Sequence, residues 1–83
     1  MTPSNPYDAK GMIKAAIRSD DPVIFYEHKR LYRLLKDEVP ADDYIVPIDK
    51  ANVVRTGSDL TVISYGMTLQ LALAAAEKLA AEG

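Results

Sequence analysis

The sequence predicts an α/β fold of the parallel-sheet type, and three observations support this prediction. Two stretches, residues 6–18 and 69–82, carry apolar residues at helical spacing. Residues 23–26 form a short apolar run whose β-branched and aromatic side chains suit a strand that is buried on both faces. A helix next to such a strand is half of a β-α-β unit, which needs a further parallel strand to be complete.

The composition excludes several classes of protein. The 83 residues are 48% hydrophobic and 27% charged, which is too apolar for a disordered chain. The net charge of −2 argues against nucleic acid or an anionic membrane as a partner, because both bind basic surfaces. The lack of cysteine excludes disulfides and cysteine-ligated metals. No uncharged run approaches about 18 residues, and the first six residues do not look like a secretory signal.

Residues 6–18 are expected to form the first helix. Asn5 suits the N-cap, Pro6 suits the first helical position, and Asp8 places a carboxylate in the first turn. Pro22 ends this segment because it disfavours the helical conformation at the preceding residue. Three basic residues occupy one face of the helix, Lys10, Lys14 and Arg18. The opposite face is expected to be the buried one, with Ala9, Met12, Ile13, Ala16 and Ile17.

The middle of the chain has a less regular pattern. Three leucines at helical spacing predict one or two helical turns around residues 30–36. Residues 36–49 contain two prolines and five carboxylates without a sustained period, which indicates an extended linker. The apolar and aromatic residues of this linker are expected to anchor it on a neighbouring surface: Tyr44, Ile45, Val46 and Ile48.

Two further strands and a second helix are predicted after the linker. Residues 51–55 and 60–64 are strand-like and flank a turn-rich tetrapeptide. Thr68 is a candidate N-cap for the last helix, whose apolar stripe is Leu69, Ala72, Leu73, Ala76, Leu79 and Ala80. We interpret the chain as two incomplete α/β units taken from a longer protein. Uncovered apolar surface costs about 25 cal/mol per Å², so the isolated chain is expected to be marginally folded or to self-associate.

Most catalytic templates are absent. One histidine and no cysteine cannot build the usual zinc sites, and neither glycine-rich phosphate-binding motif is present. His28 beside Glu27 could form an acid–base pair, but neighbours at a strand end point apart, which favours a solvated, structural histidine. Lys29, Arg30 and Arg33 could bind a phosphate or carboxylate, although a solvated or interface-facing turn is the favoured interpretation.

One cluster suggests a cation site. The first helix has no glycine at its end, so the carbonyls of Ala16 and Ile17 lack an evident cap. Ser19, Asp20 and Asp21 add a hydroxyl and two carboxylates, and hard cations prefer such oxygen ligands near the negative end of a helix. An ordinary aspartate-rich turn before Pro22 explains the same residues, so both interpretations stay open at this point.

An ordered series of motifs covers nearly the whole chain. Residues 6–11 read PYDAKG, residues 17–25 read IRSDDPVIF, residues 27–33 read EHKRLYR, and residues 62–66 read VISYG. Together they closely resemble the β subunit of the thiamine-diphosphate-dependent 2-oxo-acid dehydrogenases. Residues 25–30, which read FYEHKR, resemble the branched-chain type most closely. Relatives that act on pyruvate and acetoin share the whole series of motifs.

The resemblance implies a domain organisation and a function. Residues 1–48 would be the end of a pyrimidine-binding domain with its linker, and residues 49–83 the start of a transketolase C-terminal-like domain. The implied reaction is oxidative decarboxylation of a branched-chain 2-oxo acid or pyruvate, with acyl transfer to a lipoyl protein. The implied partners are the α subunit, in an α₂β₂ heterotetramer, and the lipoyl acyltransferase core. A non-catalytic interaction module derived from the family is the alternative.

The resemblance also implies where the cofactors lie. Thiamine diphosphate would sit at an α/β subunit interface, with magnesium held by the α subunit. The family's catalytic glutamate and histidine match no residue here, so the chain is expected to hold no catalytic or cofactor-binding residue and to be inactive alone. In mitochondrial-type relatives a structural potassium ion is bound at positions that fall here on Ala16, Ile17, Ser19 and Asp21. For a bacterial source, a cytoplasmic location is expected.

Overall fold

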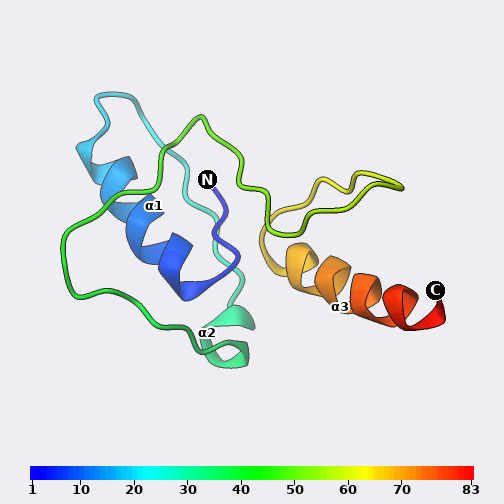
Figure 1. The fold of residues 1–83 in the computed structure, drawn as a ribbon. Helices are drawn as coiled ribbons and strands as arrows, with labels where there is room; N and C mark the ends of the chain where they lie inside the picture. Colours follow the sequence, from blue (N-terminus) through cyan, green and yellow to red (C-terminus); the bar gives the residue numbers. More distant parts are fainter.

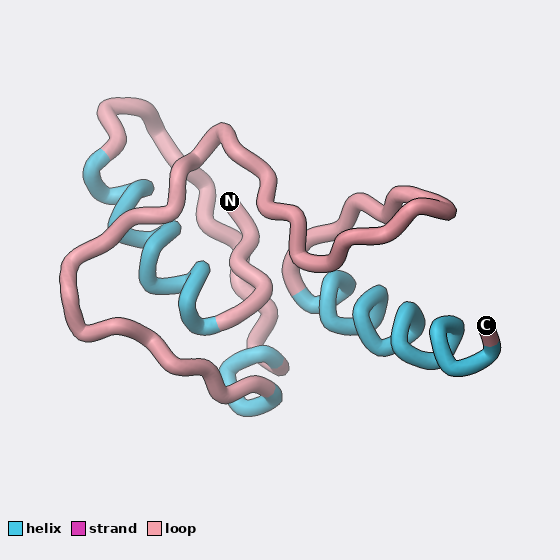
Figure 2. Tube along the Cα trace, viewed as in Figure 1, coloured by secondary structure: helices cyan, strands magenta, loops and turns pink.

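The structure, a computed structural model, describes all 83 residues and contains three helices and no paired strands (Figures 1 and 2). Helix α1 spans Pro6–Arg18, α2 spans Leu31–Leu34 and α3 spans Met67–Glu82. The molecule is elongated, with extents of 46 × 26 × 23 Å, and α3 lies at the opposite end from α1 and α2 (Figure 1). None of the three helices is both long enough and apolar enough to cross a membrane.

Helix α1 begins as the sequence predicts. The Asn5 side-chain oxygen accepts a hydrogen bond from the backbone N–H of Asp8 at 2.7 Å, and the Asn5 amide donates to the Asp8 carboxylate at 3.3 Å. This reciprocal cap satisfies an N–H group that would otherwise have no partner, and Pro6 occupies the first turn. Partial burial raises the pKa of the Asp8 carboxyl, against the opposing effect of the Asn5 bond.

The parallel sheet predicted from the sequence does not form in this chain. A strand is held by backbone hydrogen bonds to a neighbouring strand, and residues 23–26 find only Met1. The Met1 ammonium donates to the Ile24 carbonyl at 2.6 Å, and the Met1 carbonyl accepts from the Tyr26 N–H at 2.8 Å. These two bonds flank Phe25 in the pattern of a parallel pair, but the pairing ends after one residue. The predicted strand at 23–26 is therefore wrong for the chain by itself.

The two predicted strands after the linker are also absent. No backbone hydrogen bond joins residues 51–55 to residues 60–64, and the chain runs out and doubles back as a loop (green to yellow in Figure 1). All side chains from 51 to 63 are exposed, and Ile63 is 93% exposed. The apolar runs are present as predicted, but nothing covers them. The unpaired loop follows from the same lack of a neighbouring strand.

The buried face of α1 is shifted from the predicted one. Its buried residues are Gly11, which the linker covers, and Ala15. In the predicted apolar stripe Ala9, Met12 and Ala16 are half-buried, whereas Ile13 and Ile17 are 39% and 76% exposed. The Val46 N–H donates to the Gly11 carbonyl at 3.1 Å, and a Cβ atom on Gly11 would lie 2.5 Å from the Val46 side chain. Glycine therefore allows the linker to approach the helix backbone closely.

Two of the four predicted linker anchors are confirmed. Tyr44 and Val46 are half-buried against α1. Ile45 and Ile48 are 49% and 51% exposed, so the structure does not support their predicted role. The exposure of Ile45 follows from alternation along an extended segment, because successive side chains point to opposite sides. Ile48 has the same parity as Tyr44 and Val46, but it lies in a turn at residues 48–49, where the extended segment has ended.

Helix α2 lies within the predicted range, but α3 begins differently from the prediction. Gly66, with a φ of 60°, precedes the helix, and Thr68 lies inside its first turn instead of capping it. The Thr68 hydroxyl donates to the Tyr65 carbonyl at 2.6 Å and accepts from Ser64 at 2.8 Å. The first part of the predicted apolar stripe of α3 is half-buried, whereas Leu79 is 63% exposed.

We predict that Gly11→Ala releases the linker while α1 persists. Alanine favours a helix over glycine by about 1 kcal/mol, but its Cβ would overlap the Val46 side chain. Amide hydrogen exchange should show loss of protection at Val46 and retained protection in α1. Gly57→Ala is the matched control, because a Cβ at Gly57 meets nothing within 4 Å. Unchanged protection at Val46 in the Gly11 variant would contradict the packing described here.

Candidate functional site

Of the residues predicted to bind a cation, Ala16 and Ile17 lie in the last turn of α1, and Ser19 and Asp21 lie in the bend that follows it. The Ala16 carbonyl accepts the Ser19 N–H at 3.3 Å, and the Ser19 hydroxyl oxygen accepts the Asp21 N–H at 3.2 Å. The Ile17 carbonyl accepts no hydrogen bond, and the Asp21 carboxylate forms no ion pair. The four groups thus lie together at the C-terminal end of α1, as their closeness in the sequence requires.

The chemistry of these groups fits a hard monovalent cation, but the ligand set is small. Two carbonyls, one hydroxyl and one carboxylate are all hard oxygen ligands. Asp21 supplies the only formal negative charge among these four groups. No group of three or more histidine, cysteine, aspartate or glutamate side chains that could hold a metal ion occurs in the structure. The turn is open to solvent, and one segment of chain supplies every candidate ligand. Further ligands from another segment would be needed to complete a coordination shell.

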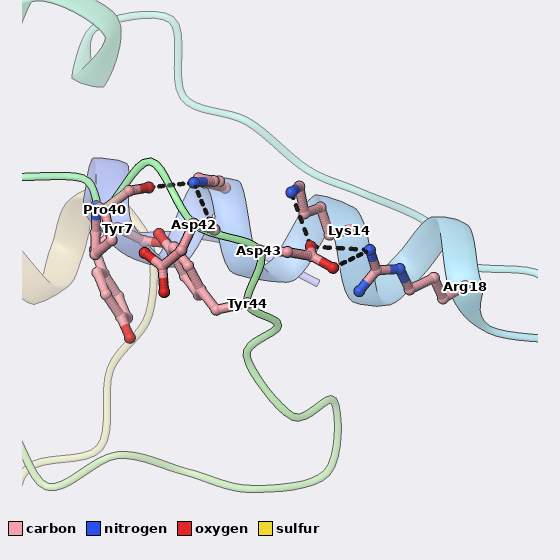
Figure 3. A network of polar contacts seen from close by, with 8 residues as sticks. Tyr7, Lys14, Arg18, Pro40, Asp42, Asp43 and Tyr44 are labelled. Atoms are coloured by element: carbon pink, nitrogen blue, oxygen red, sulfur yellow. Dashed lines mark hydrogen bonds and ion pairs between the residues drawn. The ribbon is translucent and has the colours of Figure 1, made fainter.

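A cluster of ion pairs lies beside this turn and holds the linker on α1 (Figure 3). Lys14 Nζ and Arg18 Nη2 each lie 2.9 Å from Asp43 Oδ1, and Arg18 also reaches Oδ2 at 2.9 Å. Lys10 donates to the backbone carbonyls of Pro40 and Asp42. Hydrogen bonds from Lys14 and Arg18 lower the pKa of the Asp43 carboxyl. We call these contacts the linker clamp: Lys10, Lys14, Arg18, Pro40, Asp42 and Asp43.

An aromatic pair extends the linker clamp toward the start of α1. The rings of Tyr7 and Tyr44 stack with centroids 4.6 Å apart and planes 18° apart. The Tyr44 hydroxyl donates to the Tyr7 carbonyl at 2.8 Å, and the Lys10 ammonium lies 4.8 Å from the Tyr44 ring centroid. Desolvation raises the pKa of the Tyr44 phenol. The donors and acceptors of this pair satisfy one another, which suits a positioning role better than catalysis.

The linker clamp was not predicted from the sequence. The three basic residues of α1 were placed on the face opposite the apolar stripe, and no partner was predicted for them. A signal was present, since the linker carries several carboxylates and the basic residues recur every four positions. The pairing itself could not be found from spacing, because Asp43 lies 25 residues after Arg18.

A shallow pocket of about 310 Å³ lies between the start of α1 and α2. At its rim the Tyr32 hydroxyl donates to Glu27 at 2.6 Å, which raises the pKa of the Tyr32 phenol. His28 Nδ1 accepts the backbone N–H of Met67 at 3.1 Å and no bond joins it to Glu27, in agreement with a structural histidine. The pocket is lined by Pro3, Asn5, Pro6, Ala9, Glu27, His28, Leu31, Tyr32 and Leu35.

The basic turn predicted after the first strand is exposed. Lys29, Arg30 and Arg33 form no ion pair in the structure. This agrees with the solvated or interface-facing interpretation, and no polar group gathers beside them to define an anion site.

We predict that the linker clamp weakens in acid. The pKa of the Asp43 carboxyl is lowered in the folded chain, so its stabilising effect is complete above the pKa of an unfolded aspartate and is lost as the pH falls through the folded value. An NMR titration of the Asp43 carboxyl and the Val46 amide should show both changing together, below about pH 4.

Asp43→Asn should abolish this transition at the Val46 amide, whereas Asp42→Asn should keep it. Asp42 contributes its backbone carbonyl to the linker clamp and no side-chain bond, so it is the matched control. A Val46 transition that persists in the Asp43 variant would show that another carboxyl holds the linker.

Comparison with known proteins covers both halves of the chain. Residues 49–83 match the family described as "Transketolase, C-terminal domain". Over 81 residues the chain is 63% identical to the 2-oxoisovalerate dehydrogenase subunit beta of Bacillus subtilis (strain 168). It is 51% identical to the pyruvate dehydrogenase E1 component subunit beta of Staphylococcus epidermidis (strain ATCC 12228 / FDA PCI 1200), and 48% identical to that of Staphylococcus aureus (strain N315).

Each of these alignments covers 98% of this chain and 25% of the relative, so the chain spans about a quarter of the length of the curated relatives it matches. The similarity is continuous and includes the motifs that indicated the family. The chain is therefore homologous to a segment of the beta subunits of the 2-oxo-acid dehydrogenases, as the order of its motifs predicts.

Proposed function

We propose that this chain acts as a segment of the β subunit of a thiamine-diphosphate-dependent dehydrogenase of branched-chain 2-oxo acids. The observation that supports this is its 63% identity, over 98% of its length, to a 2-oxoisovalerate dehydrogenase subunit beta. The identity to pyruvate dehydrogenase subunits is lower, at 48–51%, which favours the branched-chain substrate over pyruvate. The reaction would be oxidative decarboxylation followed by acyl transfer to a lipoyl protein.

In this proposal residues 1–48 complete a pyrimidine-binding domain and residues 49–83 open a transketolase C-terminal-like domain. The match of residues 49–83 to the transketolase C-terminal family supports the second assignment. The linker clamp then fixes the segment that leads from one domain to the other. Its contribution to the reaction is positional, because Lys14 and Arg18 are paired with Asp43, and Lys10 is bonded to the backbone carbonyls of Pro40 and Asp42.

The residues present do not fit a thiamine diphosphate site. Glu27 is bonded to Tyr32, His28 is bonded to the start of α3, and no phosphate-binding motif occurs. We therefore derive no catalytic step from this chain. The cofactor and its magnesium ion would be held by the rest of the β subunit and by the α subunit, in an α₂β₂ assembly that serves a lipoyl acyltransferase core.

The exposed apolar residues support a place inside a larger subunit. Val53, Leu60 and Ile63 are 75%, 74% and 93% exposed. Burying such side chains contributes about 1.5–3 kcal/mol each, so a covering surface would be strongly favoured. The alternative, a non-catalytic interaction module, would cover the same residues with a different partner. A cytoplasmic location, expected for a bacterial source, belongs to the same proposal.

Exchange of the homologous segment tests the proposal. In the Bacillus subtilis 2-oxoisovalerate dehydrogenase subunit beta, the 81 residues that align with this chain would be replaced by the residues of this chain. The chimaeric subunit would then be assayed together with its α subunit. We expect the chimaera to retain 2-oxoisovalerate dehydrogenase activity within about tenfold of the parent, because about two thirds of the segment is unchanged.

The isolated chain is the matched control, and calorimetry should detect no binding of thiamine diphosphate to it. A chimaera that assembles with its α subunit but is inactive would contradict the proposal. Micromolar cofactor binding by the isolated chain would contradict it as well, because it would require a site that the chain has not been assigned.

We further propose that the turn after α1 binds a structural potassium ion within the complete subunit. The Ala16 and Ile17 carbonyls, the Ser19 hydroxyl and the Asp21 carboxylate would be ligands. The free Ile17 carbonyl and the unpaired Asp21 carboxylate support this assignment. The bound ion would join the end of α1 to the neighbouring segment that completes the coordination shell.

In the chimaeric heterotetramer, potassium should raise the melting temperature relative to tetramethylammonium, and Asp21→Ala should remove this gain. Asp20→Ala is the matched control, since it deletes the same charge one residue earlier and should keep the gain. A wild type without a potassium-specific gain, or an Asp21 variant with the full gain, would overturn the assignment.

A further inference from the structure

Helix α3 receives its N-terminal cap from a residue far away in the sequence. The Met67 N–H, one of the helix donors without an intrahelical partner, donates to His28 Nδ1 at 3.1 Å. His28 lies just before α2, 39 residues earlier. No side chain of the α3 segment itself caps the helix. The start of α3 is therefore held by the other half of the chain.

The backbone at Gly66 is shaped for this contact. A Cβ atom on Gly66 would lie 2.9 Å from both Cε1 and Nδ1 of His28. The backbone φ of Gly66 is 60°, a value that residues other than glycine rarely adopt. Gly66 is also buried, which is rare in this chain. The imidazole thus lies directly against the backbone of Gly66, the residue that precedes the helix.

A second bond supports the same junction. The Gln70 side-chain amide, one turn further into α3, donates to the Ser4 carbonyl at 2.8 Å, and Ser4 is buried. Two separate contacts therefore join the first turns of α3 to the N-terminal half. Of these two contacts, only the one through His28 can change with protonation. The Gln70 amide and the Ser4 carbonyl do not titrate.

An accepting Nδ1 fixes the chemistry of the imidazole. The ring must be neutral with its proton on Nε2, since a protonated imidazole has two N–H donors and no acceptor. Protonation would place an N–H against the Met67 N–H and a positive charge at the positive end of the helix dipole. Both effects oppose the cap.

We infer that His28 couples the two halves of the chain by capping α3, and that protonation of its imidazole releases the start of α3. This inference stands on the hydrogen bond and on Gly66, and it does not depend on the proposed function. The titratable groups that line the same pockets as His28 are the Met1 ammonium, Tyr26, Glu27, Tyr32 and Tyr65.

The test compares the 83-residue chain with two variants at pH 7.5 and pH 5.0. Protection factors for the Met67 amide, corrected for the intrinsic effect of pH on exchange, report the cap. We expect the protection of Met67 in the wild type to fall at least about fivefold on acidification, while the amides of α1 keep theirs. Nitrogen NMR of the imidazole should show an unprotonated Nδ1 at pH 7.5.

His28→Asn keeps an acceptor oxygen near the position of Nδ1 and does not titrate, so its protection at Met67 should be equal at the two pH values. His28→Gln, which places its oxygen near the position of Nε2, should lack the protection at both. Protection that does not change with pH in the wild type would overturn the inference. So would a proton on Nδ1 at pH 7.5. An undiminished pH effect in His28→Asn would assign the switch to Met1 or Glu27 and would also overturn it.

Discussion

The pairing of backbone groups between strands is the constraint on which the rest of this structure depends. Residues 23–26 pair with the single residue Met1, and the runs at 51–55 and 60–64 pair with nothing. Without a sheet there is no flat apolar surface for α1 and α3 to cover. The helices therefore lie apart, and each keeps apolar residues in solvent, such as Ile17 and Leu79. These residues are exposed because no sheet covers them in this structure.

What holds the chain together instead is a small set of polar and close-approach contacts. The linker clamp and the Tyr7–Tyr44 stack fix residues 40–46 on α1, and Gly11 makes room for Val46. His28 joins the N-terminal half to α3. Each exposed ion pair contributes little to the free energy of unfolding. Few residues of the chain are buried, so burial of apolar side chains also contributes little. The close approach of Val46 to Gly11 adds a backbone hydrogen bond at a buried residue of α1.

The sequence predicted the features that depend on neighbouring residues. The cap formed by Asn5 and Asp8 lies within one turn, so local rules find it. The cation site, whose candidate ligands lie within residues 16–21, stays a prediction. The features that the sequence did not predict depend on distant partners. The cap of α3 comes from His28, so local rules pointed to Thr68 instead. The basic face of α1 meets Asp43 across an irregular linker, whose path no periodicity reveals.

We infer that residues 23–26 and 60–64 form strands within a complete β subunit, whose other segments would supply the neighbouring strands. Amide hydrogen exchange of these residues, measured in the isolated chain and in the chimaeric β subunit, tests this claim most directly. The account predicts rapid exchange in the isolated chain, apart from Tyr26, and protection of both segments in the complete subunit. Equally rapid exchange of both segments in the complete subunit would contradict it.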